Sequence, residues 1–221
     1  MRWVTYLSPS GGRERAAALD DGDVLGLPGD DRLTDLLDAG PTVLAEAHAR
    51  AVASPIEIIV EPEARMCAPV LPRALVPVRA GDDRWEVHPE LVVGVDDAVD
   101  PSADSARVGV AAVNSRDGSV LAYTPACLWL DDDGRPVQLS LGPVLATADE
   151  LGAGPLRVSA EMEERELGRG LVDPADAWLA AGPGRIRALL PVTTPPLAAN
   201  DELFVDADAL GTFEVRVGSQ V

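Results

Sequence analysis

Lysine is absent from this sequence of 221 residues, and all 18 of its basic residues are arginine. No side-chain primary amine is therefore present to form a Schiff base or to act as a general base. Cysteine is also scarce: Cys67 and Cys127 lie far apart, and there is no CxxC motif. This excludes a local metal or redox motif built on cysteine. Free thiols in a reducing compartment are expected.

Aromatic residues make up only 4% of the chain, whereas hydrophobic residues make up 47%. The core must therefore be built mainly from valine, leucine and alanine. No apolar run approaches the roughly 20 residues that a membrane helix needs. The N-terminus lacks the charged, apolar and small-residue regions of a signal peptide. We therefore expect a cytoplasmic protein that does not associate with membranes.

The formal net charge is −19, from 37 acidic and 18 basic residues. A surface this acidic repels the phosphate backbone of nucleic acids, which excludes nucleic-acid binding as the expected function.

The first 65 residues are expected to form a small unit of strands and helices. Aspartate and glycine in succession predict a tight hairpin turn, because glycine tolerates a positive φ. Threonines before apolar runs predict helix caps. The expected elements are a strand at residues 2–7, a hairpin of 13–19 and 23–27 about Asp20–Gly22, a helix from Thr34 to Gly40, and a helix from Val43 to Val52 capped by Thr42.

Residues 66–221 are expected to be mostly β-structure. A second hairpin is predicted about the turn at Asp131–Gly134, and Asp173 followed by Pro174 predicts a helix start. The expected strands are residues 90–95, 108–113, 126–130, 136–141, 156–163, 186–192, 202–206 and 212–217, with one helix ending at Gly182.

Ten short sequence words occur in an order that is specific as a set, although each is common by itself. The longest is Leu-Gly-Pro-Val-Leu-Ala-Thr-Ala-Asp-Glu-Leu at residues 141–151. In this order, the words resemble those of the fumarylacetoacetate hydrolase superfamily. They are Val4–Tyr6, Gly11–Arg13, Asp20–Leu27, Ala68–Arg73, His88–Gly94, Leu141–Leu151, Pro183–Ile186, Thr193–Pro196, Asn200–Leu203 and Leu210–Thr212.

The resemblance implies an α+β, mostly β fold with a mixed β-roll or sandwich core. It divides the chain into a small N-terminal domain, 1–65, and a family-like C-terminal domain, 66–221. The family acts on oxo-acids and β-dicarbonyl compounds, and a divalent ion such as magnesium polarises the substrate oxygens. A homodimer is implied, with a heterodimer with a paralogue as the alternative.

The family's metal site takes two glutamates from a Glu-x-Glu strand and one aspartate about thirty residues later. In this chain His88 replaces the first glutamate, Glu90 remains, and Asp117 can supply the third acid. The alternative alignment matches Arg116–Asp117 to a later Arg-Asp pair and puts Ala112 at the ligand position. A set of His88, Glu90 and Asp117 would hold magnesium or manganese weakly or not at all. A strand-edge residue without chemical role is the alternative for His88.

Two further parts of the family's apparatus are missing. The segment with the catalytic histidine and the lid is deleted, because only fourteen residues separate Arg73 from His88. The family's lysine is also absent. The resemblance assigns substrate binding to Arg116, Thr193 and Thr194, and the capping of a turn is the alternative for either threonine.

Two hypotheses follow from this degenerate site. In the first, the protein is an enzyme of hydrolase or lyase type, with Glu90 as acid or base and Asp117 orienting the substrate. It would cleave, decarboxylate, dehydrate or cyclise an oxo-acid or β-dicarbonyl metabolite, with natural-product biosynthesis as a setting. In the second, the protein is a non-catalytic family member that binds a ligand or stabilises a catalytic paralogue.

Overall fold

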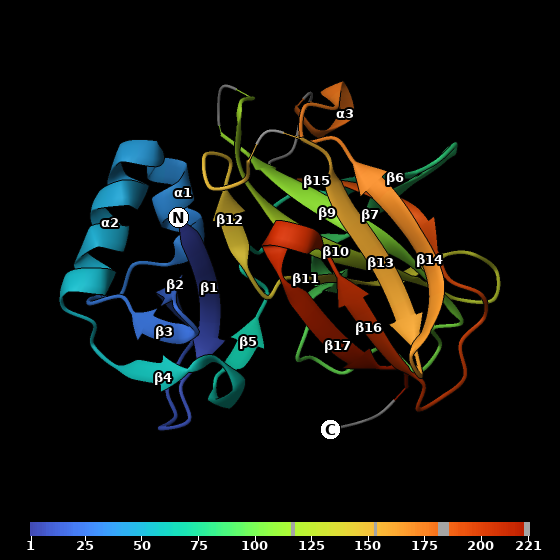
Figure 1. Ribbon diagram of the computed structural model, residues 1–221, viewed down its shortest axis with the longest axis horizontal. Coiled ribbons are helices and arrows are strands. Elements are labelled where there is room, and N and C mark those ends of the chain that lie inside the picture. Colours follow the sequence, from blue (N-terminus) through green and yellow to red (C-terminus); the bar gives the residue numbers. More distant parts are fainter. Residues whose placement is uncertain (116–117, 153, 181–185, 219–221) are drawn as a thin grey trace.

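The computed structural model describes residues 1–115, 118–152, 154–180 and 186–218. Within them, two sheets account for most of the regular structure: one has thirteen strands and the other has four. Figure 1 shows a helix-bearing unit at one side and a larger β-structure at the other. The mostly β, α+β fold predicted from the sequence is confirmed. No helix in the described part of the chain is both long and apolar enough to cross a membrane.

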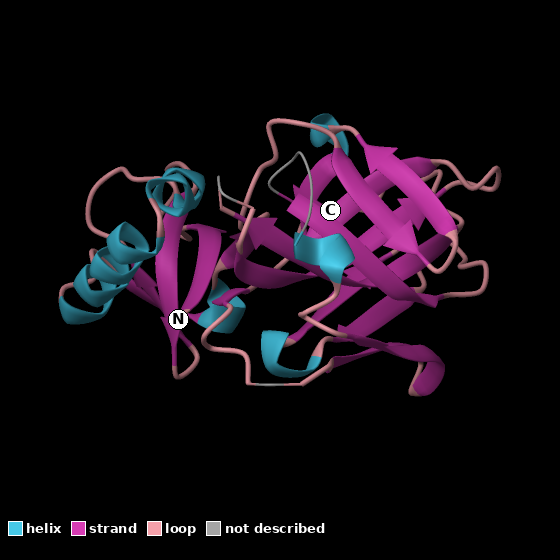
Figure 2. Ribbon diagram, turned by 90° about the horizontal axis from the view of Figure 1, so that it is seen from above, coloured by secondary structure: helices cyan, strands magenta, loops and turns pink. Residues whose placement is uncertain are grey.

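The N-terminal unit is an antiparallel sheet with two helices packed against it (Figures 1 and 2). At the predicted hairpin turn, Asp21 and Gly22 have φ values of 49° and 84°, as such a turn requires. Leucines of both helices pack on Trp3 and the strand alanines. The elements are β1 (Arg2–Leu7), β2 (Arg15–Asp20), β3 (Asp23–Gly26), α1 (Leu33–Ala39), α2 (Pro41–Ala53), β4 (Ile58–Val60) and the 3-10 helix η1 (Glu61–Glu63).

Both helices begin earlier than the sequence predicted. Helix α1 has Arg32 at its N-cap, and helix α2 has Gly40, with no side-chain cap in either case. Pro41 occupies the first turn of α2, where its missing N–H would have no helical partner anyway. Proline therefore starts this helix where capping by Thr42 was expected.

The larger part of the thirteen-stranded sheet curls into a roll. The order of paired strands in this sheet ends at β7. Strand β7 in turn contacts β11, which pairs with β10 in the middle of the sheet, so the sheet curls back on itself. The inner face is filled by aliphatic side chains such as Val78, Leu128 and Leu139. The strands are β6 (Val76–Ala80), β7 (Asp83–Val87), β8 (Val92–Gly94), β9 (Ser105–Asn114), β10 (Val120–Leu130), β11 (Pro136–Leu141), β12 (Leu145–Thr147) and β15 (Ile186–Thr193).

The four-stranded sheet covers the outer face of the roll and completes a sandwich. Val158 and Val205 of this sheet share one core cluster with Val108, Val110 and Trp129 of the roll. Its strands, with the short helices near them, are β13 (Leu156–Met162), β14 (Arg165–Val172), β16 (Glu202–Asp206), β17 (Thr212–Arg216), α3 (Ala177–Ala180) and the 3-10 helix η3 (Asp208–Leu210).

Strand β1 continues the sheet across the predicted boundary at residue 65. It pairs with β12 through Arg2 and Trp3, and with β5 (Arg65–Cys67) through Thr5 to Leu7. The sheet continues across residue 65 and so marks no boundary there. The division into 1–65 and 66–221 stays a prediction.

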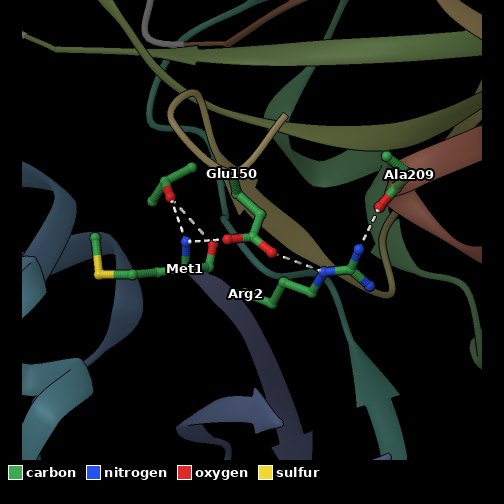
Figure 3. A network of polar contacts seen from close by, with 5 residues as sticks. Met1, Arg2, Glu150 and Ala209 are labelled. Atoms are coloured by element: carbon green, nitrogen blue, oxygen red, sulfur yellow. Dashed lines mark hydrogen bonds and ion pairs between the residues drawn. The ribbon is translucent and has the colours of Figure 1, made fainter. Parts of the chain in front are cut away.

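Polar contacts at the start of β1 reinforce this junction (Figure 3). The Met1 ammonium donates to Thr147 Oγ1 at 2.7 Å and to Glu150 Oε2 at 3.0 Å. The Arg2 guanidinium lies 3.5 Å from Glu150 Oε1 and donates to the Ala209 carbonyl oxygen at 3.0 Å. One carboxylate therefore links the first two residues to the loop after β12.

A bulge in β15 brings two backbones unusually close. The register with β9 shifts between Leu189 and Val192, so two residues, Leu190 and Pro191, lie opposite the single residue Gly109. A Cβ atom on Gly109 would overlap the Leu189 carbonyl oxygen and lie 2.6 Å from Leu190 Cα. Only glycine fits this position without movement of the chain.

Candidate functional site

The residues expected to form the Glu-x-Glu-like strand adopt a different local structure. Pro89–Leu91 form a 3-10 helix, η2, and strand β8 begins only at Val92. Pro89 occupies the first turn, and His88 caps the helix, its Nδ1 accepting a hydrogen bond from the Glu90 backbone N–H at 3.5 Å. The strand predicted at residues 90–95 therefore begins later, and both His88 and Glu90 lie before it. Proline at the start of a turn of helix favours this conformation over a strand.

Both side chains point into solvent. The side chains of His88 and Glu90 are 59% and 86% exposed, with 3.7 Å between His88 Nδ1 and Glu90 Oε2. Among the described residues, the one group of three potential ligands that could surround an ion is Asp131–Asp133. These belong to the exposed β10–β11 turn, where Asp131 accepts the backbone N–H groups of Asp133 and Arg135.

The described residues therefore do not fit the three-acid metal site that the resemblance implied. The metal role of His88, Glu90 and Asp117 stays a prediction.

Arg116 and Asp117 lie outside the described residues. The strands on either side of them meet where Asn114 pairs with Val120. In the alternative alignment, the ligand position falls on Ala112, which is fully buried within β9.

Thr193 and Thr194 lie at the other end of β9. Thr193 pairs with Arg107, whereas Ile186 pairs with Val113, and the six residues between these pairs span roughly 20 Å. Thr194 is buried, and its hydroxyl accepts the Ala106 backbone N–H at 2.8 Å. The hydroxyl of Thr194 thus already holds the end of β15 against β9. The substrate-binding role of both threonines stays a prediction.

A cleft of about 620 Å³ opens between the N-terminal unit and the segment 68–73 that follows β5. This volume is within the usual range for small-molecule sites. The two walls touch where Thr5 Oγ1 donates to the Pro69 carbonyl oxygen at 3.2 Å. Four arginines line the cleft: Arg13, Arg15, Arg32 and Arg73.

Two of these arginines are neutralised and two are not. Arg13 forms an ion pair with Asp30, and Arg73 Nη2 lies 3.4 Å from Asp35 Oδ1. Within the described residues, Arg15 and Arg32 form no ion pair. Among the described residues, the cleft therefore presents two guanidinium groups without an ion pair, together with the carboxylate of Glu14, in a protein with a net charge of −19.

A second cavity, of about 220 Å³, shares Leu7, Glu14, Ala68 and Leu71 with the cleft. Its far end is lined by Val92–Gly94, the strand directly after η2. The Cys67 thiol also lines it, but burial raises the pKa of this thiol to about 12, so it stays protonated at neutral pH. The two cavities are thus adjacent, and β8 lines only the smaller one.

Glu14 is the carboxylate that both cavities share. Asp97 at the same place is engaged, because its carboxylate accepts the Gly94 backbone N–H at 2.8 Å and pairs with Arg65. Glu14 is exposed and makes no hydrogen bond or ion pair within the part of the chain that the structure describes. Its carboxylate oxygens are therefore available to a bound ligand.

A third cavity, of about 250 Å³, adjoins the cleft at Leu71–Arg73 and Thr34. Its lining is mainly apolar and includes Val70, Leu75 and Ile186. The combined site offers cations in the cleft, a carboxylate at its edge and an apolar recess beside it. This arrangement suits a small organic acid with a hydrocarbon portion.

The sequence reasoning missed the arginines of this cleft. The Gly-Gly-Arg of residues 11–13 was recognised only as part of a family word, and Arg15 and Arg32 were not singled out. The signal available was the charged run Arg13-Glu14-Arg15 directly before a buried strand. Nothing in the sequence places Arg73, some sixty residues later, on the opposite wall.

No protein-family model and no curated protein matches this sequence. Solved structures do match. Fumarylacetoacetate hydrolase from the psychrophilic Exiguobacterium antarcticum superposes with a TM-score of 0.78 at 14% identity, covering 100% of both chains. Maleylpyruvate hydrolase from Sphingobium sp. SYK-6, in complex with manganese(II) and pyruvate, gives 0.77 at 16% identity and 98% of both chains. A 2-keto-3-deoxyarabinonate dehydratase gives 0.68 at 16% identity, also with 98% of both chains. The chain therefore has the fold of the fumarylacetoacetate hydrolase superfamily, as the ordered sequence words predicted.

Proposed function

We propose that this protein is an enzyme that acts on a small oxo-acid, with the substrate carboxylate bound by Arg15 and Arg32. The observation that carries the proposal is the cleft lined by these two arginines, neither of which has an ion-pair partner within the described residues. The fold supports it, because solved structures of similar fold are named as hydrolases and a dehydratase of such acids, and one holds pyruvate.

Guanidinium groups suit this role for a physical reason. Each presents parallel N–H donors that match the two oxygens of a carboxylate, and such charge-assisted bonds are roughly twice as strong as neutral ones. The rest of the protein is acidic, so anions are repelled from most of its surface and attracted only where positive charge is uncompensated. Arg15 and Arg32 provide such a place inside a concave site.

Glu14 is the proposed general base. With the carboxylate held in the cleft, the carboxylate of Glu14 takes a proton from the carbon next to the carbonyl group. The C–H bond breaks, its electron pair forms the enolate, and the proton moves to Glu14. Arg15, adjacent in the chain, stabilises the negative charge on the enolate oxygen. Dehydration or cyclisation would proceed from such an enolate, whereas decarboxylation or C–C cleavage would form an enolate as the C–C bond breaks.

The assignment derived from the family words competes with this one. There, Glu90 is the acid or base, Asp117, Arg116, Thr193 and Thr194 orient the substrate, and a weakly held magnesium or manganese ion assists. A single assay separates the two, because they place the base on different residues.

The assay is exchange of the methyl protons of pyruvate for deuterium, followed by proton NMR in D₂O. We expect Glu14→Gln to lose exchange while still binding pyruvate, and Glu90→Gln to exchange at the native rate. The reverse result would transfer the role of base to Glu90. Repeating the assay with EDTA and with added manganese tests the predicted ion.

Binding itself is measured by calorimetric titration with pyruvate. Arg15→Gln and Arg32→Gln should each weaken binding about tenfold, the loss expected for one charge-assisted hydrogen bond. Arg157→Gln, which removes an exposed arginine of β13 that has no ion pair among the described residues, should leave the affinity unchanged. Equal affinity in all three variants would contradict the cleft as the binding site.

A non-catalytic role is the second candidate, and the exposure of His88 and Glu90 favours it. The protein would then bind an oxo-acid without turnover or stabilise a catalytic paralogue. Pyruvate binding with no proton exchange in the native protein would support this alternative. Light scattering of the purified protein would show whether the proposed homodimer forms without a paralogue.

A further inference from the structure

Three arginines surround one tryptophan at a place remote in sequence from the arginines of the cleft. Trp178 belongs to the short helix α3, and the guanidinium carbons of Arg79, Arg84 and Arg187 lie 5.4, 5.3 and 4.5 Å from the centre of its ring. The indole N–H donates to the Ala188 carbonyl oxygen at 3.1 Å, which fixes the ring on β15. The ring in turn orients the guanidinium planes by cation–π contact.

The three arginines come from adjacent strands. Arg79 on β6 lies directly opposite Arg84 on β7, and β15, which carries Arg187, is the other neighbour of β6. Like charges directly opposite each other on a sheet are destabilising. Three arginines this close together are therefore expected to have a negatively charged group nearby.

Carboxylates of the described residues supply only part of that charge. Asp176 Oδ2 pairs with Arg79 Nη2 at 2.7 Å. Arg84 forms no ion pair within the described residues, and Arg187 instead donates through Nη1 to the Trp178 carbonyl oxygen at 3.0 Å. Nε of Arg187 is buried without a hydrogen-bond partner among the described residues. In this part of the chain, two of the three guanidinium groups thus have no carboxylate partner.

We propose that Arg79, Arg84 and Arg187 around Trp178 form a binding site for a phosphate dianion, either free or as a small phosphate ester. Two uncompensated guanidinium groups match its double charge, and their N–H forks match its oxygens. Arg84 is exposed and Arg79 and Arg187 are half-buried, so a small ligand reaches the site from solvent. None of these residues lines the cleft, so this inference does not rest on the proposed function.

The experiment uses the full chain and two probes, inorganic phosphate and methyl phosphate, titrated by calorimetry at constant ionic strength and mildly alkaline pH. Native protein should show saturable one-to-one binding of at least one probe. Arg84→Gln should weaken it about tenfold, the loss of one charge-assisted contact, and Arg84→Lys should recover only part of the affinity because the fork is lost. Arg165→Gln, an exposed arginine on β14, is the matched control and should bind as native.

The melting temperature without ligand separates binding from a structural role. If Arg84 only held α3 in place, Arg84→Gln would unfold at a clearly lower temperature. If the arginines instead form an anion site, Arg84→Gln removes repulsion between like charges, and its melting temperature should differ from that of the native protein by no more than about 3 °C. Tighter methyl phosphate binding would identify an ester as the ligand, and equal binding would identify phosphate itself. No saturable binding, equal binding by Arg84→Gln, or tighter binding of succinate than of either probe would overturn the proposal.

Discussion

Replacing Gly109 by alanine tests the close approach of β9 and β15 at the bulge. The added methyl would overlap the Leu189 carbonyl oxygen and lie 2.6 Å from Leu190 Cα and 2.9 Å from Pro191 Cδ. These are backbone atoms or atoms of a rigid ring, so no side-chain rotation can relieve the contact. Strand β15 would have to move away from β9, although it is also paired with β6 on its other side.

The cost has two parts. Overpacking a well-packed interior costs about 1–3 kcal/mol, and each ladder hydrogen bond lost in the adjustment adds about 1 kcal/mol. We therefore expect Gly109→Ala to lower the free energy of unfolding by about 3–4 kcal/mol. For a domain of this size, that corresponds to a fall in melting temperature of roughly 6–16 °C.

Urea denaturation and calorimetry measure this loss, with Gly152→Ala as the matched control. A Cβ atom on Gly152 would meet nothing within 4 Å, and its φ lies outside the left-handed region. This substitution should change stability by no more than about 1 kcal/mol, in the stabilising direction. A Gly109→Ala variant within 0.5 kcal/mol of native, roughly the spread of neutral surface changes, would refute the close approach at the bulge.

Three further predictions concern single side chains. Thr194→Val should cost about 1–3 kcal/mol of stability, measured by urea denaturation, because the buried Ala106 N–H loses its acceptor; if the threonine also binds substrate, turnover by the folded variant will fall as well. Cys67 and Cys127 should resist a thiol-specific reagent at mildly alkaline pH until the protein unfolds, since burial raises the pKa of both thiols; rapid labelling of the native protein would contradict this. Burial is the largest cause that lowers the pKa of His48, and the nearby N-terminal ammonium is the second. The His48 side chain therefore binds a proton at higher pH in the unfolded chain than in the native protein. Native stability should therefore fall as the pH drops through about 6.5, the ordinary pKa of histidine, and His48→Gln should remove that part of the pH dependence in denaturation curves.

Local turn chemistry made much of the fold predictable from the sequence. Asp21 and Gly22 adopt the positive φ values that their hairpin requires, and Gly134 does the same at the β10–β11 turn. Turns of this kind depend on three or four consecutive residues. Strands β9 and β11 were likewise predicted because their valines and leucines recur within one segment.

Local patterns failed where proline changed the backbone or where distant segments meet. An apolar run after Glu90 indicated a strand, yet Pro89 starts a turn of 3-10 helix, and only Val92–Gly94 pair. The cleft unites Arg15 and Arg32 with the segment around Arg73 through the pairing of β1 with β5. That pairing is a property of the whole sheet, so no short sequence word could reveal it.

The position of β1 between its neighbours has a consequence for how ligands enter and leave. Its ladder runs to β2 on one side and to β5 and β12 on the other, so the strands next to the two walls of the cleft are hydrogen-bonded parts of one sheet. Moving β2 away from β5 would break the hydrogen bonds that each makes with β1. Exchange with solvent must instead depend on rotation of the side chains at the rim, on the picosecond-to-nanosecond scale of exposed groups. Association should then follow a single step whose rate rises in proportion to ligand concentration, without the saturation that a slow opening motion imposes.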